Sequence, residues 1–283
     1  KEVKNNNKNI VGISRFSVEY SPNYNEEWYF QSFIKKNNND KNNTISSEIN
    51  TLENIINTNN EDEAWYFSQN IEWHKKQSQK HTFSSTINFI FDRNNPKTLW
   101  ETNEPILQNL IPIDTSQNQF RLNQIEENKK NFLHTVFKDF WILNNNNHIY
   151  STIGNIYQKE KFISRDTQIL DDNSQNDFYL SGFNNTTTFM FNDFFLGLHY
   201  KFRKGIFTLK QGVYLHNYNW KVEQKNLITS NKWVPLPDFL LKIEFNNSKK
   251  IQLNYNLKSN FSEASKLANR FYLKSYNSVF KGN

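Results

Sequence analysis

Residues 194 to 216 read FFLGLHYKFRKGIFTLKQGVYLH, and the spacing of the apolar side chains in this stretch decides the fold. Every second residue from Phe194 to Phe202 is apolar or aromatic, and the same period resumes at Phe207 after Lys204-Gly205. Successive side chains of a β-strand point to opposite faces, so a period of two predicts strands. With Lys204-Gly205 as a two-residue turn, Phe202 pairs with Phe207 and the two apolar sides coincide. The stretch predicts a β-hairpin with one apolar and one polar face.

The same alternation recurs along the chain, for example where Ile251, Leu253 and Tyr255 alternate with Gln252 and Asn254. It predicts an all-β protein of ten strands. The strands are expected at residues 10–20, 27–36, 64–75, 81–92, 131–143, 148–158, 194–203, 206–216, 239–246 and 250–258.

The connections between these strands alternate in length. Short joins are expected at Ser21–Glu26, Lys76–Lys80, Asn144–Asn147, Lys204–Gly205 and Asn247–Lys249. Long joins are expected at 37–63, 93–130, 159–188 and 221–236. Tight turns on one side and long loops on the other are typical of transmembrane barrels, whereas a β-sandwich gives no reason for this alternation.

The pairing within hairpins supports the same architecture. A hairpin centred on Ser248 pairs Ile243 with Leu253, and one centred on Ser78 pairs Trp73 with Phe83. A slip of one residue would move every one of these side chains to the wrong face. Half-buried strands of a soluble sandwich alternate as well, so the pattern alone leaves that fold open.

Composition narrows the class of protein further. The 283 residues include no Cys, which excludes disulfides and thiolate metal sites, and 16% of them are aromatic, which argues against disorder despite a mean hydropathy of −0.83. No apolar run reaches the roughly 18 residues of a membrane helix. The net charge of +6 is spread along the chain, so nucleic-acid binding is not expected. The chain opens without a signal peptide, so we expect a mature chain or an excised piece.

Strand length and aromatic placement favour a membrane. The predicted strands run about ten residues, which suits a tilted crossing of a bilayer. Aromatic residues gather at their ends: Tyr20 and Trp28 near a short turn, and Trp65, Trp220 and Trp233 near long loops. Aromatic girdles at both interfaces mark outer-membrane barrels. We therefore expect an antiparallel up-and-down transmembrane β-barrel, with residues 1–283 forming part of a single barrel domain in the outer membrane.

Three stretches resemble the barrel of TonB-dependent receptors, in particular those with a carboxypeptidase-regulatory-like domain before the plug: His199–Gly212, Lys232–Phe245 and Phe261–Asn283. The resemblance covers most of the chain and is sharpest from about residue 187. It implies a 22-stranded barrel with an N-terminal plug, which imports a scarce ligand with energy from the inner membrane. This sequence departs from the family in having no recognisable plug or TonB-contacting segment and about half the strands. We therefore expect an incomplete barrel from the middle of a longer protein.

Each face of the predicted strands receives a role. The side chains expected to face a wet lumen, and so a possible ligand path, are His199, Lys201, Arg203, Lys210, His216, Lys242, Glu244, Asn254 and Lys258. Those expected to face lipid are Phe83, Phe89, Leu196, Leu241, Leu253 and Tyr255. The excess of Lys in the lumen would weakly favour anionic ligands through its summed field.

No pattern of catalytic or metal-ligating residues is recognisable. The six His residues lack the spacing of a zinc site, and 171–177 lacks the central Gly and final Glu of an EF-hand. Helical spacing at 262–270 predicts a short loop helix. We expect no enzyme and no cofactor, with outer-membrane lipid, an unidentified small ligand and, through a plug outside this chain, the TonB system as partners. Two alternatives stay open: a complete small barrel with a protease or lipase site, and a structural or adhesin-like barrel.

Overall fold

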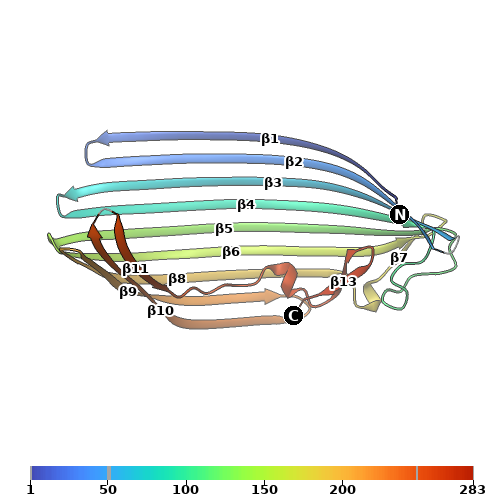
Figure 1. Cartoon of the computed structure of the whole chain (residues 1–283). Coiled ribbons are helices and arrows are strands. Elements are labelled where there is room, and N and C mark those ends of the chain that lie inside the picture. The colour runs from blue at the N-terminus through green and yellow to red at the C-terminus, as the bar shows by residue number, and fades with distance from the viewer. Residues whose placement is uncertain (1, 50–51, 247, 283) are drawn as a thin grey trace.

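A computed structural model describes residues 2–49, 52–246 and 248–282. Within this part of the chain the main sheet is antiparallel, has 11 strands and runs up and down in chain order from β1 to β11, with the short β7 paired beside β6 (Figure 1). The long strands are β1 (Glu2–Asn23), β2 (Glu26–Ile49), β3 (Leu52–Ser78), β4 (His81–Thr102), β5 (Phe120–Asn144), β6 (Asn147–Ile169), β8 (Asn185–Lys204), β9 (Phe207–Glu223) and β10 (Leu227–Asn246). The shorter elements are β7 (Gln175–Asp177), β11 (Lys249–Asn256), β12 (Phe271–Ser275), β13 (Ser278–Lys281) and two 3-10 turns, η1 (Tyr179–Ser181) and η2 (Ala264–Leu267).

The ten predicted strands correspond to ten strands of this sheet in the predicted order, which confirms the up-and-down topology. The last prediction was two residues too long, because β11 ends at Asn256. The helical spacing at 262–270 corresponds to the single 3-10 turn η2.

The predicted long loops are largely wrong. Apart from 50–51, which lie outside the described residues, 37–63 belongs to β2 and β3, and 221–236 shrinks to a short join after Glu223. The other two shrink to 103–119 and to 170–184, which contains β7 and η1. The Asn-rich parts carry no apolar alternation, yet their backbone groups continue the ladder, with Asn37 opposite Ala64. The strands are therefore up to 27 residues long.

The predicted hairpin registers differ from the structure by two residues in every case. Phe202 faces Leu209 instead of Phe207, because the turn lies at Gly205-Ile206, where Gly205 has a φ of 56°. A positive φ at the first turn position is what one class of two-residue hairpin requires. Ile243 likewise pairs with Ile251 and Trp73 with Ser85. A shift of two residues leaves every side chain on its predicted face.

The sheet curls, and the face inside the curl carries the predicted lumen residues. His74 of β3 and Thr82 of β4 line the same hollow as Lys242 and Glu244 of β10, although four or five strands lie between them in the sheet. We call this the polar face and the opposite side, which carries Leu196 and Leu198, the apolar face. The C-terminal segment with η2 and β12 lies across the polar face (Figure 1).

Three glycines of the polar face make room for rings of the neighbouring strands. A Cβ built on Gly212 would lie 2.3 Å from Cδ2 of His199 and 2.6 Å from the Leu198 carbonyl oxygen. Gly154 and Gly197 receive Phe195 and Tyr214 in the same way, with rings within 2.4 Å of the added carbon. The absence of a side chain at these positions lets rings lie flat on the sheet.

Substitution of Gly212 by Ala should therefore destabilise the sheet. The new carbon meets backbone as well as a ring, and overpacking of this kind costs about 1–3 kcal/mol. Gly12→Ala is the matched control, since its Cβ would meet nothing within 4 Å. Denaturant titration of the full-length protein in lipid vesicles measures both, and equal stability of the two variants would contradict this packing.

Candidate functional site

A hollow of about 850 Å³ on the polar face gathers most of the predicted lumen residues. It lies near the short turns and takes side chains from β3 to β10. Six of the nine predicted residues line it: His199, Lys201, Arg203, Lys210, Lys242 and Glu244. Sequence reasoning did not name the other lining residues as lumen residues; they include His74, Lys138, Tyr150, Thr152 and Tyr214. Nothing in the sequence indicated how far the sheet curls, and therefore which side chains of distant strands share one hollow.

The charge of this hollow is positive. Five cations line it: Lys138, Lys201, Arg203, Lys210 and Lys242. Asp139 and Glu244 among the lining residues and Asp238 beside them oppose these, which leaves an excess of two positive charges. Lys242 pairs with Glu244 at 2.6 Å on the exposed rim. A concave surface with one sign of charge concentrates counter-ions, so the hollow favours anionic solutes.

Asp238 organises the inner part of the hollow. One of its carboxylate oxygens lies 3.2 Å from Nε2 of His199 and 3.4 Å from Nζ of Lys210. His199 is only 2% exposed, and its ring lies against Gly212 and edge-on to Tyr214 at 4.7 Å between centroids. The carboxylate therefore satisfies a buried ring nitrogen as well as a lysine.

A second hollow of about 440 Å³ continues the first toward the long connections and shares Lys138, Thr152 and Tyr214 with it. It contains the predicted residues His216 and Lys258. Nδ1 of His216 lies 2.9 Å from both oxygens of Asp193, which is almost fully buried. Consecutive contacts within about 6 Å link its rings into a row: Tyr214, Phe195, His216, Tyr218, Phe261 and Phe191. The hollow is thus aromatic where the first is cationic.

The remaining predicted residues also lie on the expected faces. Asn254 is exposed on the edge strand β11 and pairs with Leu240, which lines the larger hollow. The six residues predicted to face lipid all lie on the apolar face, where Leu196 is 43% exposed and Leu253 57%.

The apolar face carries a band of exposed apolar side chains. It includes Phe83–Phe91 on β4, Ile153 on β6, Phe194–Phe202 on β8, Phe207–Leu215 on β9 and Ile251–Tyr255 on β11. Aromatic residues border it on the turn side (Tyr20, Trp28, Trp73 and Trp141) and on the other side (Trp65, Tyr157 and Trp233). A row of charges lies level with Trp65 of this second border: Lys36 and Arg93 pair with Trp65 on either side, and Lys129 and Lys161 continue the row on β5 and β6. Glu63 lies two residues farther along β3. Trp220, predicted at a border, instead packs on the polar face, because β9 continues to Glu223 and its even-numbered residues lie on that face.

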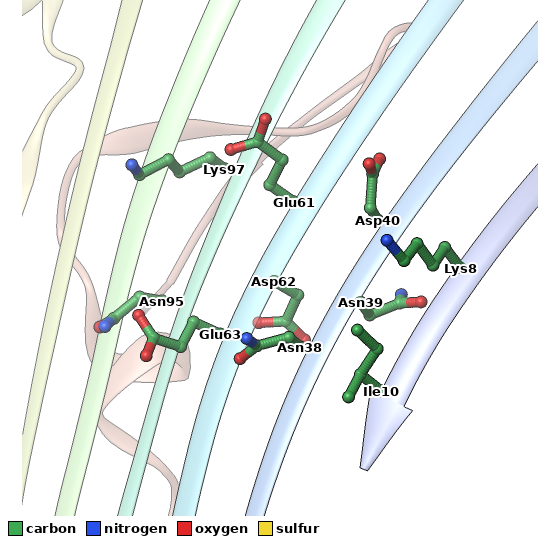
Figure 2. Close-up of a pocket in the computed structure, with 10 residues that line it drawn as sticks. All are labelled: Lys8, Ile10, Asn38, Asn39, Asp40, Glu61, Asp62, Glu63, Asn95 and Lys97. Atoms are coloured by element: carbon green, nitrogen blue, oxygen red, sulfur yellow. The ribbon is translucent and has the colours of Figure 1, made fainter.

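Beyond this band lies a hollow of opposite charge, on the strands that extend past the apolar side chains. Figure 2 shows its lining side chains on β1 to β4. Four carboxylates oppose two lysines there: Asp40, Glu61, Asp62 and Glu63 against Lys8 and Lys97. It lies apart from the two hollows of the polar face, with which it shares no residue.

The carboxylates of the acidic stretch 171–177 accept hydrogen bonds from nearby groups of the connections. Asp171 accepts hydrogen bonds from Asn118, Asp172 from Ser174, and Asp177 from the Tyr179 N–H. Where the chain is described, no three His, Cys, Asp or Glu side chains are grouped to hold a metal ion, and no helix is long and apolar enough to cross a membrane.

No protein-family model matches the sequence, and no curated protein matches it either.

Asp238→Ala should lower the free energy of unfolding by about 1–3 kcal/mol, because it leaves the buried ring nitrogen of His199 without a partner. Glu244→Ala, on the same strand and face, should change the free energy of unfolding much less, because its pair with Lys242 is exposed to solvent. Urea titration of both variants checks this, and a larger cost at Glu244 would reverse the assignment.

Proposed function

We propose that strands β1 to β11 form part of the wall of an outer-membrane β-barrel that transports a solute along its polar face. The exposed band of the apolar face carries this proposal. Soluble monomers rarely expose apolar surface in one large patch. Here Leu198, Leu253 and Ile153 are 59%, 57% and 44% exposed on one side of a single sheet. A hydrocarbon layer is the environment that stabilises such a surface.

The height of the band supports the same proposal. On β8 and β9 it covers nine residues each, Phe194–Phe202 and Phe207–Leu215. At about 3.4 Å per residue and a tilt of about 40°, this corresponds to roughly 20 Å across the membrane, close to the band of known barrels. The bordering Trp and Tyr side chains match interfacial girdles, and the charged side chains level with Trp65 match the headgroup region.

Both edges of the sheet bear on the architecture. β1 and β11 each pair with one neighbour within the described residues, so their outer backbone groups have no strand partner there. Lipid does not tolerate unpaired backbone groups, so in a membrane each edge needs a further strand. We propose that strands outside β1–β11 complete a larger barrel of the TonB-dependent receptor type.

The hollows of the polar face then form the solute path. The resemblance to TonB-dependent receptors suggests import of a scarce ligand, driven by the TonB system through a plug outside this sheet. The excess of two positive charges in the larger hollow favours an anionic ligand.

Replacement of band residues by Arg tests the membrane environment. Leu198→Arg and Leu253→Arg should each lower the free energy of unfolding in vesicles, because each places a charge in the hydrocarbon layer. The cost is roughly 2–4 kcal/mol for a position near the middle of the bilayer. Asn254→Arg, one residue along β11 on the polar face, should cost little. All three positions are exposed in this sheet. A soluble protein would therefore tolerate all three, and that outcome would refute the proposal.

Thiol labelling on intact cells tests the orientation, because the chain has no Cys to interfere. Gln108→Cys lies in the connection 103–119 and Asn145→Cys lies in the turn after β5. In the full-length protein, a membrane-impermeant maleimide should label Gln108→Cys on intact cells and Asn145→Cys after lysis alone. The opposite pattern would invert the orientation, and labelling of neither until lysis would place the protein elsewhere.

A further inference from the structure

The C-terminal segment forms a layer of its own on the polar face. After β11 the chain crosses the wall through η2 and β12, at the end of the sheet that carries the long connections (Figure 1). We call residues 261–273 the strap. Its β12 pairs with β13 in a separate two-stranded sheet. In the described part of the chain, one isolated bridge, between Phe271 and Phe183, links it to other strands or connections. The strap can therefore leave without breaking the ladder of the main sheet.

The strap packs on the wall through small and aromatic side chains. Ala264, Ala268 and Tyr272 are buried against the polar-face residues Phe162, Phe189, Tyr218 and Val222. The rings of Tyr272 and Phe162 meet edge-on at 5.1 Å. At the start of the strap, Phe261 lies 4.3 Å from the ring of Phe191 and covers one end of the aromatic hollow.

Polar side chains of the wall bind the backbone of the strap. Glu160 accepts a hydrogen bond from the Ala264 N–H at 2.9 Å, and Asn185 bonds the N–H of Arg270 at 3.0 Å and its carbonyl at 3.2 Å. Asp166 accepts from the Leu273 N–H at 3.4 Å, and Gln124 donates to the Leu273 carbonyl. These four wall residues are buried and come from β5, β6 and β8. They form a seat for an extended chain.

The strap also holds the two long connections. Leu273 is fully buried among Trp100 and Leu122 of the wall, Ile111 of 103–119, and Phe178 and Phe183 of 170–184. Arg270 donates to the Phe183 carbonyl at 2.5 Å and stacks over the ring of Tyr179. Displacement of the strap would therefore loosen both connections together.

We propose that residues 261–273 form a releasable strap that closes the hollows of the polar face at the end of the long connections. This proposal rests on the proposed function, because the strap lies where a solute would enter from outside the cell. The strap acts as a gate on the wall. A solute reaches the aromatic hollow when the strap leaves its seat.

One buried carboxyl makes this seat sensitive to pH. Asp166 is fully buried, and its Oδ2 has no hydrogen-bond partner. Burial, helped by the nearby charge of Glu126 on β5, raises its pKa to about 7, against the lowering effects of the Leu273 N–H and Gln124. The other ionisable groups around the seat are Glu160, which pairs with Lys130 at 3.0 Å, Arg270 and Tyr272 on the strap, and Glu126 and Lys274. Burial raises the pKa of Tyr272 to about 12, and Lys274 lowers the raised pKa of Glu126.

The sign of the pH dependence follows from these values. With the strap released, Asp166 regains an ordinary pKa of about 4, so the seated state binds the proton more tightly. Seating is strongest below about pH 4 and weakens up to tenfold per pH unit until about pH 7, where the loss is complete. Asp166→Asn removes this dependence and keeps an acceptor for the Leu273 N–H.

Thiol labelling of two neighbouring strap residues in the full-length protein on cells measures release. Ala268 is fully buried and Asn269 is exposed. The ratio of the Ala268→Cys to the Asn269→Cys labelling rate cancels the intrinsic effect of pH on thiols. We expect a ratio below about 1/100 at pH 5 that rises at least tenfold by pH 8. The buried and exposed pair Ala264→Cys and Lys266→Cys should behave alike and guards against misfolding of one variant.

Asp166→Asn should keep the ratio low at both pH values, whereas Asp172→Asn in the exposed connection should leave the rise intact. A ratio near one at pH 5 would show that no strap is seated, and a ratio independent of pH in the unsubstituted background would refute release through Asp166. Failure of the proposed function looks different, because then neither thiol is labelled on intact cells. The ratio after lysis still reports on the strap.

Discussion

The backbone ladder of an antiparallel sheet is the constraint on which this structure depends. Each strand must satisfy the backbone groups of its neighbours, so the facing of one strand sets the facing of the next across the whole sheet. A shift of the register by two residues keeps every side chain on its face of the sheet, whereas a shift of one residue exchanges the two faces. The hairpins at Gly205-Ile206 and after Ser78 follow this rule, since both differ from the predicted register by two.

The rule explains which features the sequence could predict. The facing of Leu196, His199 and Lys242 followed from alternation alone and is independent of the register error. The length of β2 and β3 could not be predicted, because their distal halves are held by backbone pairing and cross-strand bonds such as Thr44 to Asn57, which leave no apolar period. The seat of the strap was equally hidden, because its polar residues lie far apart in the sequence and meet only after the sheet has formed.

Because the sheet curls, the alternating side chains form two different surfaces, one outside the curl and one inside it. The apolar face presents a bordered band of exposed hydrophobic side chains, and the polar face encloses a cationic hollow and an aromatic one that run into each other. Glycines at three positions let rings lie on the wall and shape the aromatic part. The strap covers this path at one end through contacts outside the main ladder, so the wall can stay rigid while the strap and the connections that it holds move.

A spin-label scan along β9 would test the central claim most directly, namely that one face of this sheet meets lipid and the other meets water. Single nitroxides at residues 207–215 of the full-length protein in vesicles would be probed with oxygen, which partitions into lipid, and with a water-soluble nickel complex. The account predicts oxygen maxima at odd positions such as Val213, and nickel maxima at even positions such as Lys210, with a period of two and opposite phase. Oxygen and nickel accessibility that rise and fall together along the strand would contradict it.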